Sequence, residues 1–132
     1  MDPKQLRDAC LRFPGAFEDF PFGPEASVFK VRADSRTAKM FALSSLDAVP
    51  LSVSLKCEPA LAESLRAGYP EITAAYHMNK SHWNGVDCAG NLEKQMIIDM
   101  IEDSYDLVVA SLTARQREGL DWRRVVEDGA ID

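Results

Sequence analysis

Residues 76–88, YHMNKSHWNGVDC, place two histidines, a tryptophan and a cysteine within one short stretch of the chain. His77, His82 and Cys88 are residue types that bind zinc, but structural zinc sites use closely paired ligands with a second pair elsewhere. The spacing here is irregular and supplies no fourth ligand. We therefore expect no metal site and no cofactor, with one histidine packed under a sheet and the other on the surface.

Nucleophilic catalysis by a cysteine is the second chemistry that these residue types suggest. It requires a thiol within hydrogen-bond reach of a histidine base, in an electropositive and partly open site. Cys57 and Cys88 supply thiols, but a cysteine between Asp87 and Ala89 on a strand is more often a small buried residue. The chain also contains neither GxxxxGK[ST] nor GxGxxG, the common phosphate-binding loops. We predict that the protein is not an enzyme.

The same segment has the pattern of a hairpin, in which AAYHMN and HWNGVD form short strands around a turn near residues 80–81. Tyr76, Met78, Trp83 and Val86 are expected to be structural anchors, with Trp83 fixing the hairpin to the core because large aromatic residues in strands are usually buried. In the alternative, Trp83 stacks on a nucleic-acid base. Three polar residues at the turn form the candidate contact surface: Asn79, Lys80 and His82. The Asn79 side chain could instead bond to the local backbone.

Length and charge limit the class of protein. A chain of 132 residues, 46% hydrophobic and 27% charged, suits a single globular domain. The net charge is −6, of which −1 falls in residues 1–88 and −5 in residues 89–132. Nucleic acid would be repelled by the chain as a whole, so its binding would need a local basic patch in the first two thirds.

Compartment is predicted from three features. The chain has no apolar run of the roughly 18 residues that a membrane span needs, and MDPKQLRDAC lacks the apolar stretch of a signal peptide. Its cysteines, Cys10, Cys57 and Cys88, are odd in number and widely spaced, which favours reduced thiols. We expect a cytoplasmic protein that does not bind membranes.

Hydrophobic periodicity predicts the order helix, three strands, helix, two strands, helix. Asp2, Pro3 and Gln5 form a capping pattern for the first helix, which Pro14 ends. Residues 17–27, FEDFPFGPEAS, are expected to be a loop whose phenylalanines fill the core. The predicted strands are SVFKVR, AKMFAL and LSVSLK, and the last alternates apolar and polar residues.

The longest predicted helix, beginning near residue 90, carries an apolar series on one side and carboxylates on the other. Tyr105 belongs to the apolar series and is expected to be a structural anchor in the core, with its hydroxyl bonded at the edge. Ser104 is expected to bond to the backbone of its own helix. Residues 1–112 then form the domain, and residues 113–132 form a short helix, capped by Thr113 with Gln116, and a tail.

Short connections between successive strands predict an antiparallel sheet with the helices on one face, a two-layer α+β domain. The other face would be exposed. On it we expect Lys30, Arg32 and Lys56, with Arg36 in a turn and Lys39 close by.

FPFGPEASVFKV, KMFAL, YHMNKSHWNGVD and IEDSYDLVVASL, in this order, resemble the MmcQ/YjbR family of small bacterial proteins. The resemblance spans about residues 4–112. It implies an α+β fold similar to type III secretion chaperones, described as a double-wing motif, and DNA binding, which is predicted for the family from that shape. Relatives commonly have glycines before the position of Lys39. The segment RADSRTAK makes this turn longer and more polar.

We therefore predict a DNA-binding protein that uses a local basic surface of sheet and turns. Its expected contacts are Arg32, Arg36, Lys39, Lys56, Asn79, Lys80 and His82. The alternative is a protein- or peptide-interaction module that uses the exposed sheet face or edge, which fits the acidity better. Against it, the outward residues of LSVSLK are polar, and the sequence shows no exposed apolar stripe. A monomer or weak dimer is expected.

Overall fold

The computed structural model describes residues 1–75 and 77–127. Its elements are helix α1 (Pro3–Leu11), strands β1 (Ala16–Asp19), β2 (Ser27–Arg32), β3 (Ala38–Ser44) and β4 (Ser52–Lys56), helix α2 (Pro59–Gly68), strands β5 (Ile72–Ala74) and β6 (Trp83–Asp87), and helices α3 (Lys94–Ala110) and α4 (Ala114–Glu127). Within those ranges, no helix combines the length and the apolar character needed to cross a membrane.

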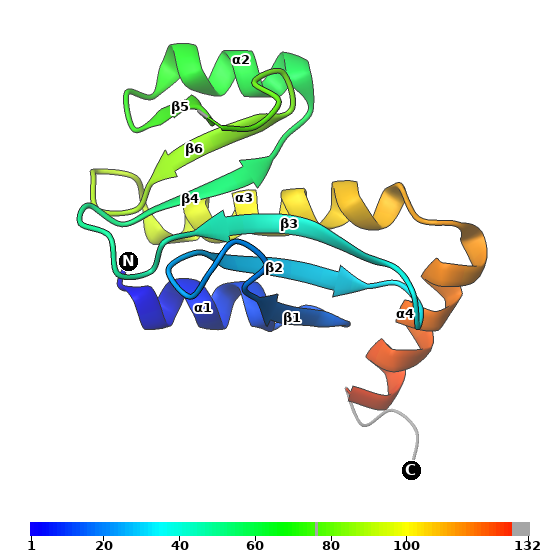
Figure 1. Ribbon diagram of the computed structural model, residues 1–132. Coiled ribbons are helices and arrows are strands. Elements are labelled where there is room, and N and C mark those ends of the chain that lie inside the picture. The colour runs from blue at the N-terminus through cyan, green and yellow to red at the C-terminus, as the bar shows by residue number, and fades with distance from the viewer. Residues whose placement is uncertain (76, 128–132) are drawn as a thin grey trace.

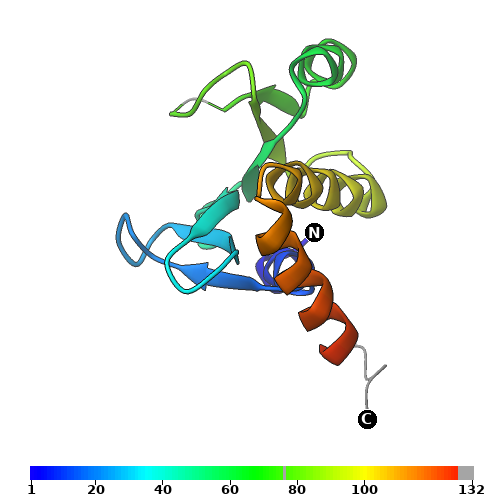
Figure 2. The ribbon, with the colours of Figure 1, turned by 90° about the vertical axis from the view of Figure 1, so that its right-hand side faces the viewer.

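The strands form one six-stranded sheet in the order β1-β2-β3-β4-β6-β5, and every neighbouring pair is antiparallel (Figure 1). Helices α1, α2 and α3 lie on the same side of this sheet (Figure 2). The predicted two-layer α+β fold is confirmed.

Two details of the predicted element order are wrong. Four strands precede α2, because residues 16–19, mostly assigned to a loop, form β1 and pair with Val28–Val31 of β2. The phenylalanines of this segment do not fill the core, since Phe20 and Phe22 are exposed to 45% and 74%. The hairpin strand predicted at residues 74–79 is also misplaced: β5 ends at Ala74, and Tyr76 lies outside the described residues.

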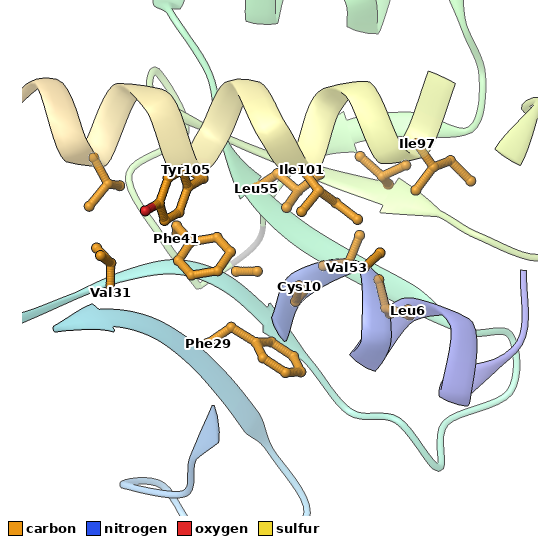
Figure 3. Packing of buried hydrophobic residues seen from close by; sticks show 14 of the residues in the cluster. Leu6, Cys10, Phe29, Val31, Phe41, Val53, Leu55, Ile97, Ile101 and Tyr105 are labelled. Carbon is orange, nitrogen blue, oxygen red and sulfur yellow. The ribbon is translucent and has the colours of Figure 1, made fainter. Parts of the chain in front are cut away.

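Helix α3 supplies much of the core, which it forms with α1 and the inner face of the sheet (Figure 3). Tyr105 is 4% exposed, and its ring stacks on Phe13 with centroids 4.6 Å apart and meets Phe41 edge-on at 5.4 Å. Its hydroxyl donates a 2.6 Å hydrogen bond to the Pro14 carbonyl oxygen. The prediction of Tyr105 as a core anchor bonded at the edge is confirmed.

A β-bulge in the β2–β3 pair decides which residues of β3 face inward. Phe29 pairs with Ala42 and Lys30 with Met40, so Phe41 is the extra residue between them. Phe41 and Ala42, adjacent in sequence, are therefore both fully buried in the core. Met40 and Leu43 on either side point to the outer face.

Ser104 joins α3 to the two central strands. Its hydroxyl donates to the Phe41 carbonyl oxygen at 2.6 Å and accepts from the Lys56 N–H at 2.9 Å. The expected bond within the helix is therefore wrong: the serine satisfies backbone groups of β3 and β4. Those strands are paired only at residues 42–43 with 54–55, so the hydroxyl bridges them where their own ladder stops.

Both predicted capping boxes are present. Asp2 accepts from the Gln5 N–H at 2.8 Å, and the Gln5 side chain accepts from the Asp2 N–H at 3.0 Å. Thr113 and Gln116 exchange the equivalent bonds at the start of α4. Helix α4 has 14 residues, more than the short helix expected, and Leu120 joins the core cluster. Residues 128–132 of the predicted tail lie outside the described residues.

Candidate binding surface

The regular pairing of β4 with β6 shows which of their residues point to the outer face of the sheet. Directly paired residues of antiparallel strands point to the same face. The outward pairs are Ser52 with Asp87, Ser54 with Gly85, and Lys56 with Trp83. The inward residues between them, Val53, Leu55 and Val86, are buried.

Trp83 therefore lies on the face opposite to the one we predicted. It was expected to anchor the hairpin to the core, but it is half-buried on the outer face and is not part of the core cluster. The physical reason is register, since the first residue of β6 pairs with the outward Lys56. Asn84, which follows it, is the residue that points inward and is buried.

Trp83 is one wall of a depression of about 470 Å³, which we call the outer hollow. The other lining residues are Phe22, Met40, Leu43, His77, Met78 and Asn79. They come from three separate segments: the β1–β2 loop, strand β3 around its bulge, and the β5–β6 loop. The exposed apolar surface that the sequence did not reveal is thus assembled on the face expected to be polar.

A second depression of about 430 Å³ continues the outer hollow toward the other end of β4 and β6. The two share Leu43, His77 and Met78. The second is more polar, with Ser52, Ser54, Thr73, Glu71 and Asp87 among its lining residues. Together they form a groove along the sheet, apolar at the Trp83 end and acidic at the Asp87 end.

Hydrogen bonds hold the β5–β6 loop that borders the outer hollow. The Asn79 side chain accepts from the Ser81 N–H at 3.0 Å, which confirms that it bonds to the local backbone. The Asn79 carbonyl oxygen accepts from the N–H groups of His82 and Trp83. From α2, Arg66 donates to the Lys80 carbonyl oxygen at 2.9 Å and to the Asn84 side chain at 3.0 Å.

Arg66 is the positioning residue that sequence reasoning missed. Its only sequence signal is its place in the last turn of α2, where a cation commonly stabilises the helix end. That position gives no indication of a bond to a loop 14 residues further along the chain. Contact of α2 with β5 and β6 brings the guanidinium to the loop.

The basic residues predicted to contact DNA are only partly brought together. Strands β2 and β4 both run antiparallel to β3, so their ends at Arg32 and Lys56 lie at the same end of the sheet, as does Trp83. Arg36 is exposed in the β2–β3 turn, beside α4, whereas Lys80 and His82 are exposed in the β5–β6 loop, on the side of α2 (Figure 1). The Arg32 guanidinium lies 4.6 Å from the centroid of the Phe17 ring.

Lys39, expected close to the exposed face, points away from it. It pairs with Val31, a core residue, and therefore points to the side covered by helices. Its ammonium donates a 3.1 Å hydrogen bond to the Ser111 hydroxyl at the end of α3. Lys30 does reach the outer face, where its ammonium lies 2.8 Å from the Asp19 carboxylate.

The three thiols lie in environments that oppose ionisation. Burial raises the pKa of Cys10 to about 12 and that of Cys88 to about 11, and burial followed by the Asp103 charge raises the pKa of Cys57. Each thiol is therefore a poorer source of thiolate at neutral pH than a free cysteine.

The residues considered for zinc do not converge. His82 immediately precedes β6 and Cys88 immediately follows it, so the strand separates them. His77 and His82 are both exposed, contrary to the expectation that one histidine packs under the sheet. In the part of the chain that the structure describes, no group of three His, Cys, Asp or Glu residues is placed to hold a metal ion.

A family model described as YjbR matches residues 11–107. The chain belongs to the YjbR family. It is 36% identical to the uncharacterized protein YbdF of Escherichia coli O157:H7, over 89% of this chain and 96% of that protein. It is 30% identical to the uncharacterized protein YjbR of Escherichia coli K12, over the same shares of the two chains.

Solved structures agree with this membership. The crystal structure of Deinococcus radiodurans protein DR2400 matches with a TM-score of 0.85 and 34% identity, covering 91% of this chain and 88% of that one. A crystal structure of a Pseudomonas syringae protein matches with a TM-score of 0.68 and 32% identity, covering 81% of this chain and 98% of that one. The likeness in DR2400 extends over nearly the whole YjbR fold described above.

Proposed function

We propose that this YjbR family chain is a non-enzymatic binding module that holds an extended apolar segment of a partner protein in the outer hollow. The observation that carries this proposal is the apolar lining of that hollow on the face of the sheet opposite the helices. Exposed apolar surface with a polar border is typical of protein interaction sites. It supplies the affinity that a polar sheet face would lack.

The lining favours apolar side chains as ligands. Met40 and Met78 are flexible, polarisable side chains that can adapt to different partners. Trp83 and Phe22 add aromatic area, and aromatic residues dominate the energetics of protein interfaces. The groove runs along β4 and β6 for the length of the strands, which suits an extended segment better than a compact one.

DNA binding is a second candidate, supported by one specific observation. Arg32 and Lys56 share the sheet end at which Trp83 lies, with Lys80 and His82 in the neighbouring loop. Cations near a partly exposed aromatic ring are a combination that favours binding of single-stranded nucleic acid. The net charge of −6 and the bond between Lys30 and Asp19 reduce the attraction.

Peptide display against the wild-type protein tests the first proposal, with counter-selection against a Trp83→Ser, Phe22→Ser double variant. Peptides with several large apolar residues should be enriched. In fluorescence anisotropy, their affinity should fall at least tenfold in the double variant, because anchors in a binding hollow carry most of the free energy. Val49→Ser is the matched control, since Val49 is 96% exposed and does not line the hollow.

The proposal fails if no peptide prefers the wild-type protein to the double variant. For the DNA candidate, anisotropy at low salt with a labelled oligothymidine and a labelled duplex is the direct measurement. Lys80→Ala should then weaken binding and reduce its salt dependence. Lys39→Ala should have no effect, because Lys39 points to the helix side. Nucleic-acid binding with this pattern, in the absence of peptide binding, would replace the first proposal by the second.

A further inference from the structure

A second groove lies on the other side of the sheet, between α2 and α3. Helix α2 packs on β5 and β6, helix α3 packs on β3 and β4, and both helices are seen nearly end-on in Figure 2. The groove has a volume of about 360 Å³ and is lined by Cys57, Glu58, Leu61, Asp103, Asp106 and Leu107. We call it the helix groove.

The floor of the helix groove is apolar. Leu61 of α2 is 45% exposed, although its neighbour Ala62 is fully buried against the sheet. Leu107 of α3 is half-buried on the facing side. A smaller depression beneath them also includes Leu61 and continues to Leu65 and Met100. The packing of α2 on β5 and β6 therefore leaves an apolar strip facing α3.

The rim of the helix groove is acidic. Glu58, Asp103 and Asp106 belong to the lining, and on α3 Asp99 lies one turn before Asp103 and Glu102 immediately precedes it. Partial burial, and then the charges of Glu102 and Asp99, raise the pKa of Asp103, which reflects the concentration of negative charge.

The nearby cations whose side chains the structure describes have other contacts. Arg12 lies 3.6 Å from the Glu102 carboxylate, and Arg66 bonds to the β5–β6 loop. Lys56 borders the smaller depression beneath the groove, and its side chain belongs to the outer face. Among the described residues, negative charge therefore predominates along the side formed by α3.

We propose that the helix groove binds a cationic amphipathic segment of a partner protein. Apolar side chains of the segment would pack on Leu61 and Leu107, and its lysines or arginines would lie against the carboxylates of the rim. Charge complementarity identifies the occupant, because an acidic rim repels nucleic acid and acidic peptides and attracts a basic segment. The site is independent of the outer hollow, since the sheet separates them.

The test uses a fluorescein-labelled helical peptide of leucine and lysine, measured by anisotropy against the full chain. A peptide of the same length with glutamate in place of lysine is the ligand control and should not bind. The variant Glu58→Gln, Asp103→Asn, at two carboxylates of the lining, should weaken binding of the lysine peptide at least tenfold. Leu61→Ser should weaken it about fivefold, the order expected when a partly exposed apolar contact is removed.

Charge alone is controlled by Glu25→Gln, Asp47→Asn, which changes the net charge equally at exposed positions outside the lining. That variant should bind the lysine peptide as the wild type does. An equal loss in it would mean diffuse attraction and would overturn the proposal, as would unchanged binding in Leu61→Ser. Amide NMR shifts of the wild-type protein, which require no variant, should map to α2 and α3, and shifts elsewhere would contradict the proposed site.

Trp83→Ser should leave lysine-peptide binding unchanged, whatever the result of the peptide display. Loss of binding in Trp83→Ser would place the peptide in the outer hollow and overturn the helix-groove proposal. The failure of either proposal is thus distinguishable from the failure of the other.

Discussion

The outer hollow and the helix groove are both apolar depressions, but they lie on opposite faces of one sheet and have different borders. The outer hollow is lined by aromatic and thioether side chains and bordered by a loop that carries Asn79, Lys80 and His82. The helix groove is lined by two leucines and bordered by carboxylates. Similar floors with different rims indicate different partners, since apolar area supplies affinity and charge selects among ligands.

The comparison also locates the acidity of the chain. Exposed carboxylates of α3 lie on the helix side, away from the outer hollow. The net charge of −6 therefore describes the whole chain better than it describes either surface. The acidity of the chain therefore argues against nucleic-acid binding more strongly on the helix side than on the outer face.

The largest expected difference is in stability: replacing an aromatic residue of the inner face should cost much more than replacing one of the outer face. Phe41→Ala should lower the free energy of unfolding by about 3–5 kcal/mol, because it opens a cavity among fully buried side chains. Trp83→Ala should lower it by less than about 1 kcal/mol, because its ring lies outside the core cluster. Urea denaturation of both variants measures the difference. A loss in Trp83→Ala as large as that in Phe41→Ala would return Trp83 to the role of core anchor.

Ser104 links helix α3 to strands β3 and β4, so its removal should affect the whole domain. Ser104→Ala leaves the Phe41 carbonyl oxygen and the Lys56 N–H without this partner, and each buried unsatisfied group costs about 1–3 kcal/mol. We expect a loss of about 2–4 kcal/mol in urea denaturation and faster amide exchange at Lys56. Ser64→Ala, at an exposed position of α2, is the matched control and should stay within about 0.5 kcal/mol of the wild type.

The smallest expected effect on stability is that of replacing Asp103, in the lining of the helix groove. Because the pKa of Asp103 is raised in the folded chain, ionisation of this group disfavours folding at neutral pH. Asp103→Asn should therefore stabilise the protein at pH 7, by less than about 1 kcal/mol because the carboxylate is largely exposed.

The pH dependence of that difference is the check. The advantage of Asp103→Asn should disappear as the pH falls through the raised pKa of Asp103 toward and below its ordinary value of 3.8, where the carboxyl is protonated in both states. Thermal melts of both proteins between pH 7 and pH 3 measure it. An advantage that persists undiminished in acid would argue against the charge of Asp103 as its cause.

Local patterns predicted much of the framework. The capping boxes at Asp2 and Thr113 need only residues three positions apart, and both are present. The alternation of LSVSLK and the apolar series that includes Tyr105 likewise follow from the period of one element. The order of motifs was sufficient to predict the YjbR family.

The candidate surfaces could not be predicted in the same way. Trp83 was assigned to the wrong face, and the face of Lys39 was not predicted, because the face of a strand residue depends on its register with a neighbouring strand. The bulge opposite Phe29 and Lys30 adds a further shift, which places Met40 and Leu43 outward with two buried residues between them. The β-propensity of a segment predicts neither its register with a neighbouring strand nor the position of a bulge.

By itself, the sequence determined the helices, the N-terminal caps of α1 and α4, the strongest strands and the overall α+β class, because each depends on a period or on contacts between near neighbours. Only the tertiary structure decided where β1 pairs, which way Trp83 points and how Ser104 joins β3 to β4. The outer hollow and the helix groove belong to this second group. Each is built from segments far apart in the chain, and the depth and charge of such a surface exist only once strand pairing and helix packing have brought those segments together.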